Sequence, residues 1–125
     1  GLVGSEMCIR DSYSPDHKNA VNEAFRETYL NQYKKQPPQF SAQAFAAVQV
    51  YVEALQALDK KTPIKNLSLE QLRTDLNKQL LTGTYDTPIG LISFSPTGEV
   101  NQKDFYVAEM KVDKDGNNGQ FVYLK

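Results

Sequence analysis

Few side chains in this sequence could carry out chemistry. It contains one histidine, His17, and one cysteine, Cys8. His17 could serve as a general base, but it lies in the first turn of an expected helix, where a solvated histidine is the more ordinary reading. A zinc site needs about four ligands, drawn mainly from histidine and cysteine. We therefore expect no catalytic role for His17, and neither a metal nor another cofactor.

The acidic side chains lead to the same expectation. Asp113 and Asp115 lie in "DKDGNNG" and faintly resemble a calcium loop, but the glutamate that such a loop needs downstream is absent. A polar hairpin loop explains them better. Asp86 and Asp104 precede expected strands, where aspartate commonly stabilises turns. The sequence also lacks a glycine-rich phosphate loop and a nucleophile elbow. We expect a protein that is not an enzyme.

Composition and charge narrow the class further. With 125 residues the chain has room for one small domain, and 40% hydrophobic with 23% charged residues describes an ordinary globular protein. A formal net charge of −1 gives no electrostatic basis for binding nucleic acid or an anionic membrane surface. No stretch approaches the ~20 apolar residues of a membrane span. We expect no nucleic-acid partner.

The segment 1–12, "GLVGSEMCIRDS", has no periodicity. It resembles the in-frame translation of a transposon-end sequencing adapter, so we expect it to be adapter-derived and to take no part in the fold. A disordered tail is the alternative. The sequence shows no signal peptide, which would have a basic region followed by an apolar core. This absence carries little weight if residue 1 is not the natural start. Because Cys8 lies in this segment, the remaining chain has no cysteine for a disulfide.

Three helices are expected before the strands begin. In "SPDHKNAVNEAFRETYLNQYKK", Ser14 is expected as the N-cap and Pro15 as the first helical residue, with Asn22 on the wet face and "QPPQ" as the end. The second helix is expected from about Ser41, within "FSAQAFAAVQVYVEAL". It is apolar on nearly every side, so other elements must cover most of it.

The third helix and the strands follow from clear punctuation. Ser68 and Gln71 have capping-box spacing, and Gly83 is expected to stop that helix. "YDTPIG" is a turn-rich lead-in, "LISF" is a short strand and "SPTG" is a β-turn. "DFYVAEMKV" and "QFVYL" are expected to pair as a hairpin. The resulting fold class is α/β: three helices, a short strand and a β-hairpin. These strands cannot cover the helices, so we expect the C-terminal fragment of a larger protein.

Phe40 follows the double proline and precedes the second helix. Two readings stay open from the local sequence. Phe40 is a hydrophobic staple that fixes the entry into the helix, or it reaches a ligand cleft at the edge of an open α/β sheet.

A family resemblance covers essentially all of Tyr13 to Lys125. "YKKQPPQFSAQAF", "TPIGLISFSPTGEV" and "KDFYVAEM" resemble the C-terminal third of type I periplasmic solute-binding proteins, and in particular the leucine-binding-like receptors of ABC transporters. The resemblance implies a two-lobed α/β fold whose lobes close over a ligand by hinge motion. It implies that residues 13–100 belong to the first lobe, and that residues 101–125 form the last crossover and a hairpin docking on the second lobe.

The same resemblance implies the function and the site. An amino acid, branched-chain or otherwise neutral, would bind in the interlobe cleft and be delivered to membrane permease subunits. Phe40 would contact the ligand side chain, which favours the cleft reading over the staple, and Ser41 and Gln43 would line the cleft. The protein would be an exported, periplasmic monomer without a cofactor. The alternative is a cytosolic ligand-sensing regulator with the same fold.

Overall fold

The computed structural model describes residues 8–11, 13–103 and 105–124. In this part the helices are α1 (Ala20–Tyr33), α2 (Gln39–Lys61) and α3 (Leu69–Thr82), with a 3-10 turn at Ile64–Asn66. The strands are β1 (Cys8–Asp11), β2 (Thr84–Thr87), β3 (Gly90–Phe94), β4 (Val100–Gln102), β5 (Tyr106–Val112) and β6 (Gly119–Leu124). The fold is α/β, as expected.

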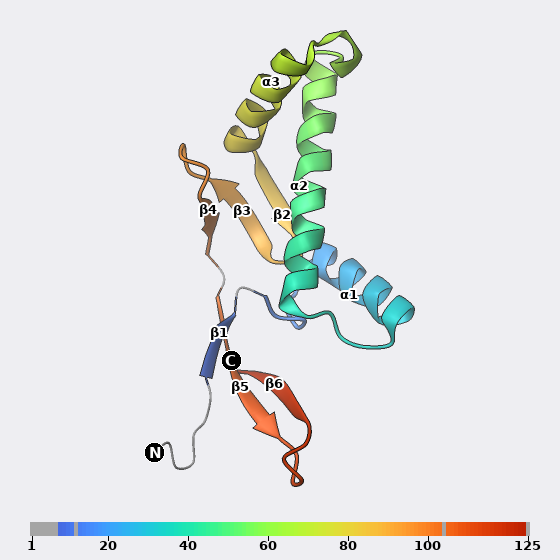
Figure 1. Ribbon diagram of the computed structural model, residues 1–125, viewed down its shortest axis with the longest axis vertical. Coiled ribbons are helices and arrows are strands. Elements are labelled where there is room, and N and C mark those ends of the chain that lie inside the picture. Colours follow the sequence, from blue (N-terminus) through green and yellow to red (C-terminus); the bar gives the residue numbers. More distant parts are fainter. Residues whose placement is uncertain (1–7, 12, 104, 125) are drawn as a thin grey trace.

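The strands form two separate antiparallel sheets, with orders β1-β5-β6 and β2-β3-β4. Extensive packing among the described elements stays within two groups. We call the three helices with the β2-β3-β4 sheet the helical unit, and the β1-β5-β6 sheet the hairpin sheet. Figure 1 shows the hairpin sheet standing apart from the helices, connected through the chain before α1 and the chain after β4.

Helix α1 starts later than the sequence suggested. Its N-cap is Asn19, whose side chain accepts a hydrogen bond from the Asn22 amide at 2.6 Å. The expected N-cap, Ser14, is instead buried in a turn, where its carbonyl accepts from the His17 amide at 3.1 Å. The prediction failed because Ser14 and Asn19 are both good caps, and the turn at Ser14 makes its own hydrogen bond before the helix begins. Lys34, with φ 58°, ends the helix.

Helix α2 begins at Gln39, two residues before the expected start, because the extended backbone of Pro38 leads directly into it. Its buried residues recur at every fourth position: Ala42, Ala46, Val50, Ala54 and Leu58. Most are small, so neighbouring backbones approach closely. Its exposed large apolar residues are Phe40, Phe45, Val48, Tyr51 and Val52. As expected from the sequence, the elements of this chain cover only part of an apolar helix.

Helix α3 begins as predicted. The Ser68 hydroxyl accepts from the Gln71 amide at 3.2 Å, and the Gln71 side chain accepts from the Ser68 amide at 3.1 Å. The helix stops before Gly83, where a β-carbon would collide with the Tyr85 hydroxyl. That hydroxyl donates to carbonyls of the last helical turn. Burial, and secondarily the charge of Glu53, raises the pKa of Tyr85.

The stretch expected as a lead-in is part of a sheet. Thr84 to Thr87 pair with β3 as strand β2, and the Thr87 hydroxyl donates to the buried Gly90 carbonyl at 2.8 Å. This side-chain bond, together with φ 102° at Gly90, closes the tight β2–β3 turn. The expected β-turn at "SPTG" is confirmed, since the Gly98 amide donates to the Ser95 carbonyl at 2.9 Å.

The expected hairpin is confirmed as β5 and β6, with Val112 paired to Gly119 at its closed end. On its other edge, β5 pairs with β1. Our expectation that residues 1–12 take no part in the fold is therefore wrong for Cys8–Asp11, because an open strand edge pairs with an extended backbone whatever its side chains. Residues 1–7 and 12 lie outside the described part, and the adapter origin of the segment stays a hypothesis.

The core of the helical unit lies where α2 meets α1, α3 and the β2–β3 hairpin. Its buried members are Tyr13, Phe25, Ala42, Ala46, Val50, Ala54, Tyr85, Ile89 and Ile92. The cluster fixes the N-terminal end of α2 against the chain that precedes α1, which is where the predicted ligand contacts lie.

Candidate functional site

The N-terminal end of α2 carries all three predicted site residues. Pro38 is the N-cap and supplies no side-chain hydrogen bond, and the first turn of the helix contains no acidic residue. Phe40 lies in this turn and is 78% exposed, the highest value among the large hydrophobic residues of the described part. The ring of Phe40 therefore lies largely in water at the helix start.

The structure excludes the staple reading of Phe40. In a hydrophobic staple, the residue before the N-cap packs against the fourth helical residue. In α2 these positions are Pro37 and Ala42, and both are buried. Phe40 is the second helical residue and faces solvent, so it does not fix the helix entry. Its ring is free of that packing role, which leaves contact with a ligand as the open reading.

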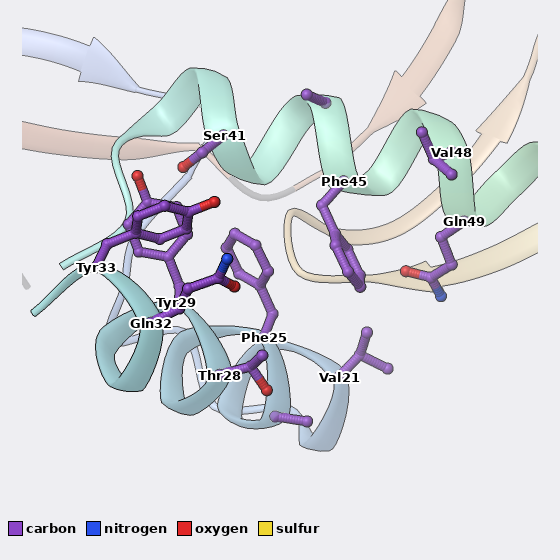
Figure 2. A pocket seen from close by; sticks show the side chains of 12 residues that line it. Val21, Phe25, Thr28, Tyr29, Gln32, Tyr33, Ser41, Phe45, Val48 and Gln49 are labelled. Atoms are coloured by element: carbon purple, nitrogen blue, oxygen red, sulfur yellow. The ribbon is translucent and has the colours of Figure 1, made fainter. Parts of the chain in front are cut away.

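Ser41 lies at one end of a groove of about 740 Å³ between α1 and α2. Its hydroxyl donates to the Pro38 carbonyl at 2.6 Å, which stabilises the first turn. Figure 2 shows aromatic side chains from both helices along this groove. The rings of Phe25 and Phe45 lie 4.9 Å apart, and Tyr29 continues the row along α1. The groove is apolar and open.

Gln43 lines a different cavity, of about 600 Å³, between α2, α3 and the β2-β3-β4 sheet. Ser41 and Gln43 therefore face different hollows, and Phe40 lines neither. The three residues share one helix end, but the chain does not by itself bring them to a single cavity. A cleft that used all three would need walls from beyond these residues.

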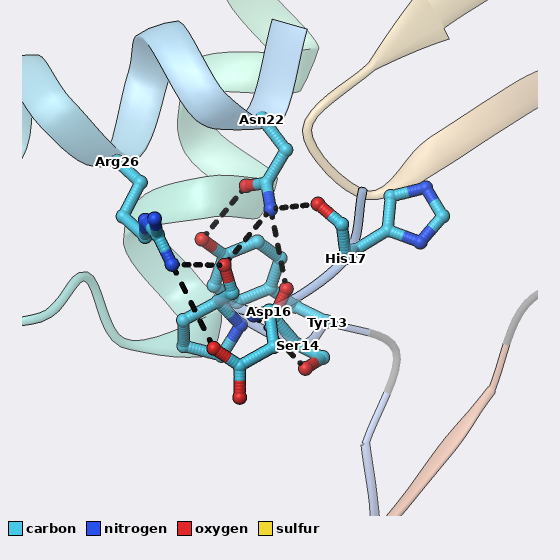
Figure 3. Close-up of polar contacts among 7 residues, drawn as sticks. Tyr13, Ser14, Asp16, His17, Asn22 and Arg26 are labelled. Carbon is cyan, nitrogen blue, oxygen red and sulfur yellow. Dashed lines mark hydrogen bonds and ion pairs between the residues drawn. The ribbon is translucent and has the colours of Figure 1, made fainter. Parts of the chain in front are cut away.

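The polar cluster in front of α1, drawn in Figure 3, was not predicted from the sequence. Asn22, which we expected on the wet face, is fully buried. It accepts from the Tyr13 hydroxyl at 2.9 Å and donates to the carbonyls of Ser14, Pro15 and His17 at 3.4, 3.2 and 2.7 Å. An asparagine amide can satisfy several carbonyls at once, which is why it can be buried here. The one sequence signal for this role is that Asn22 lies one helical turn before Arg26 and follows the turn that contains Pro15.

His17 does not lie in a helix, contrary to our expectation. It sits in the turn before α1, and its Nδ1 is hydrogen-bonded to the Tyr106 hydroxyl of β5. A third cavity, of about 970 Å³, lies between this turn, the start of α1 and the β5–β6 side. It is lined by charged side chains of both signs from the α1 side, by Tyr106 and Tyr123 of the hairpin sheet, and by Phe105, which precedes β5.

Among the described residues, no group of three or more histidine, cysteine, aspartate and glutamate side chains is placed to hold a metal ion. Asp113 instead organises the β5–β6 turn, accepting from the Asn117 and Asn118 amides and the Asn118 side chain. Those hydrogen bonds, that of the Asn118 side chain foremost, lower the pKa of Asp113. Within the described ranges, no helix is long and apolar enough to cross a bilayer.

Comparison with known proteins identifies the family. The family model described as "Periplasmic binding protein" matches residues 5–118, so the chain belongs to this family of solute-binding proteins. Members of the family are exported to the periplasm. The match begins within the segment that we expected to be foreign to the fold. No curated protein matches the sequence.

Solved structures of ABC transporter binding proteins share the fold. A solute-binding protein of R. palustris in complex with benzoate is 26% identical, with a TM-score of 0.72 over 99% of this chain. A substrate-binding protein of Desulfitobacterium hafniense in complex with Leu is 20% identical, with a TM-score of 0.71 over 95%. A leucine-, isoleucine-, valine-, threonine- and alanine-binding protein of Brucella ovis is 18% identical, with a TM-score of 0.68 over 100%. The chain spans 30–32% of the length of these proteins.

Proposed function

We propose that this chain belongs to the substrate-binding component of an ABC transporter that captures an amino acid, branched-chain or otherwise neutral. The family match over residues 5–118 is the observation that carries the proposal. Leu, benzoate and 3,4-dihydroxybenzoic acid, which are bound by three similar proteins, are all small carboxylic acids. A branched-chain amino acid carries the same carboxylate, next to an ammonium group that the two benzoic acids lack, and its apolar side chain suits an exposed aromatic contact.

The division into two lobes is also a proposal. Residues 13–100 would belong to the first lobe, and residues 101–125 would form the last crossover and the hairpin docking on the second lobe. The separation of the hairpin sheet from the helical unit supports a division close to this point, after β4, because Asn101 and Gln102 still pair with β3 in the helical unit. The exposed apolar side chains of α2, such as Val48 at 65% and Tyr51 at 54%, would be covered by the remainder of the first lobe.

Phe40 would contact the apolar part of the ligand, and Ser41 and Gln43 would line the cleft around it. The exposure of Phe40 and the absence of a staple role support this assignment. The groups that hold the ammonium and carboxylate would come from other parts of the two lobes. The protein would act as a monomer in the periplasm, delivering its ligand to permease subunits without a cofactor and without catalysing a reaction.

Phe40→Ala tests the assignment in the protein expressed from its complete gene. We expect the dissociation constant for L-leucine to rise about tenfold, because losing the apolar area that the ring buries against the ligand costs about 1.4 kcal/mol. The free energy of unfolding should change by less than about 0.5 kcal/mol, since the ring is mostly in water. Isothermal titration calorimetry and urea unfolding measure the two quantities.

Leu69→Ala is the matched control, since Leu69 is also a large apolar residue at a helix start and is 62% exposed. It should change neither quantity. Equal affinities of the Phe40→Ala variant and the unmodified protein would remove Phe40 from the site. If neither L-leucine nor L-valine binds the unmodified protein, the proposed ligand class is wrong, and binding of benzoate alone would indicate an aromatic carboxylate instead.

The isolated 125-residue chain should bind none of these ligands tightly, because Phe40, Ser41 and Gln43 do not enclose a common cavity within it. We expect no heat of binding to the isolated chain at ligand concentrations that saturate the protein from the complete gene. Micromolar binding by the chain alone would show that the site is complete within these residues, and would contradict the proposed shared cleft.

A further inference from the structure

We propose that His17 and Tyr106 form a latch that holds the hairpin sheet at its angle to the helical unit. The inference rests on the proposed function only where it concerns ligand affinity. The two residues are far apart in the sequence and belong to different units: His17 to the turn before α1, and Tyr106 to the first position of β5.

The contact has two components. The Tyr106 hydroxyl and the His17 Nδ1 are hydrogen-bonded. The two rings also meet edge to face, with centroids 5.8 Å apart and an interplanar angle of 71°. An edge-to-face arrangement of aromatic rings is favourable beyond the area that the rings bury. Together the two components fix both the distance between the units and the orientation of one toward the other.

Each side of the latch is anchored within its own unit. The His17 carbonyl accepts from the buried Asn22 side chain at 2.7 Å, and the His17 amide donates to the Ser14 carbonyl. Tyr106 lies in β5 and meets the ring of Tyr123 on β6 at 6.4 Å and 87°. A displacement of the hairpin sheet is therefore transmitted through Tyr106 to a rigid turn, rather than absorbed by a loose side chain.

The contact between His17 and Tyr106 is important for the orientation of the two units because little other packing joins them. Extensive packing among the described elements does not cross between the two units. The cavity of about 970 Å³ beside the latch means that the units are not packed together there. In such an arrangement, one directed contact of modest energy can shift the balance between two orientations.

Distance measurement by pulsed electron–electron double resonance tests the latch directly. Spin labels are placed at Lys65→Cys in the helical unit and Lys114→Cys in the β5–β6 loop, both exposed positions, with other cysteines replaced by serine. The protein is expressed from its complete gene and measured without ligand. Tyr106→Phe keeps the ring and removes the hydroxyl, and His17→Ala removes both components. We expect a shifted and broadened distance distribution in both variants.

His17→Asn separates the components, because the asparagine amide can take the place of Nδ1 without the ring. Its distribution should lie between that of His17→Ala and that of the unmodified protein. Tyr51→Phe, which removes an exposed hydroxyl from α2, is the control and should leave the distribution unchanged. Distributions for Tyr106→Phe and His17→Ala that superimpose on that of the unmodified protein would overturn the latch.

The same variants distinguish the latch from the proposed function. If the latch sets the balance between open and closed lobes, Tyr106→Phe should change the L-leucine dissociation constant about two- to fivefold, because a shift in the competent population rescales the apparent affinity. A changed distance distribution with an unchanged dissociation constant would keep the latch and reject its role in closure. An unmodified protein that binds no probe would overturn the proposed function, while the distance measurement would still decide the latch.

Discussion

The starts of α1 and α2 follow similar proline-containing loops but are built in opposite ways. Helix α1 is capped by Asn19, and the loop before it is held by the fully buried Asn22. Helix α2 is preceded by Pro38, which supplies no side-chain cap, and it presents Phe40 to solvent. One helix start satisfies its polar groups with residues of this chain, while the other leaves its apolar ring uncovered.

This difference separates structure from function within one small chain. A buried polar group without a partner costs about 1–3 kcal/mol, so a network such as that of Asn22 exists to hold backbone in place. An exposed aromatic ring gives no stability of that kind. Where a fold leaves such a ring uncovered beside an otherwise ordered helix, a ligand or another part of the protein is the natural partner.

The largest effect is expected for Asn22→Ala. The substitution removes the acceptor of the Tyr13 hydroxyl and the donor to three loop carbonyls. We expect a loss of about 3 kcal/mol in the free energy of unfolding, because several buried groups lose their partners together. Urea unfolding measures it. Asn31→Ala, at an exposed position of the same helix, is the control. Equal losses in both variants would show that the network does not stabilise the loop.

The two N-caps, Asn19 and Pro38, should differ in how much they contribute to the free energy of unfolding. Asn19→Ala removes the 2.6 Å bond from the Asn22 amide and the 3.2 Å bond to the Thr87 carbonyl, and should cost about 1–2 kcal/mol. Pro38→Ala removes no side-chain hydrogen bond, and should cost less than about 1 kcal/mol through the greater freedom of the unfolded chain. Thermal unfolding of both variants gives the difference. A larger loss from Pro38→Ala would reverse the contrast between the two helix starts.

The smallest effect is expected in the hairpin sheet, whose polar loop lies in water. The pKa of Asp113 is lowered in the folded state, so its ionised form stabilises the β5–β6 turn above the unfolded pKa, near pH 4, and this contribution is lost as the pH falls. Asp113→Asn should therefore be slightly less stable than the unmodified protein at pH 7, and the difference should shrink as the pH falls below about 4. A difference that stays constant as the pH falls would point to a cause other than ionisation.

The sequence predicted an element correctly where its local signal had a single structural interpretation. The capping box of Ser68 and Gln71, the stop at Gly83 and the β5–β6 hairpin all follow from such signals. Strands β2 and β4 did not, because they are short and their sequences are rich in polar and turn-forming residues. Their pairing with β3 comes from the tertiary arrangement, which overrides weak strand propensity.

The errors at α1 have a different cause. Ser14 and Asn22 are polar, and residue type alone assigns polar residues to caps and wet faces. Whether an asparagine is buried depends on the carbonyls that surround it, and those come from a loop folded back on the helix. The pattern of residue types does not show that this loop folds back on the helix.

The candidate site was predictable only in part. The position of Phe40 at a helix start could be read from the double proline, and the structure rejects the staple that competed with the ligand contact. That Ser41 and Gln43 face different cavities could not be predicted, because it depends on how α1 and α3 pack around α2. The contact between His17 and Tyr106 joins residues with no pattern in common, and only the tertiary structure places them together.

Large apolar residues are usually the least tolerant of substitution, but in α2 the buried residues are mostly small and several large ones are exposed. Ala42 and Ala54 are fully enclosed, whereas Val48 and Tyr51 are largely in water. Adding a methyl or two to an alanine should harm folding more than shortening a valine or a tyrosine. A deep mutational scan of this helix in the isolated chain would therefore rank the buried alanines, Ala42, Ala46 and Ala54, as the intolerant sites. If the same scan in the protein from the complete gene also penalised changes at Val48 and Tyr51, the added penalty would map the surface that the rest of the protein covers.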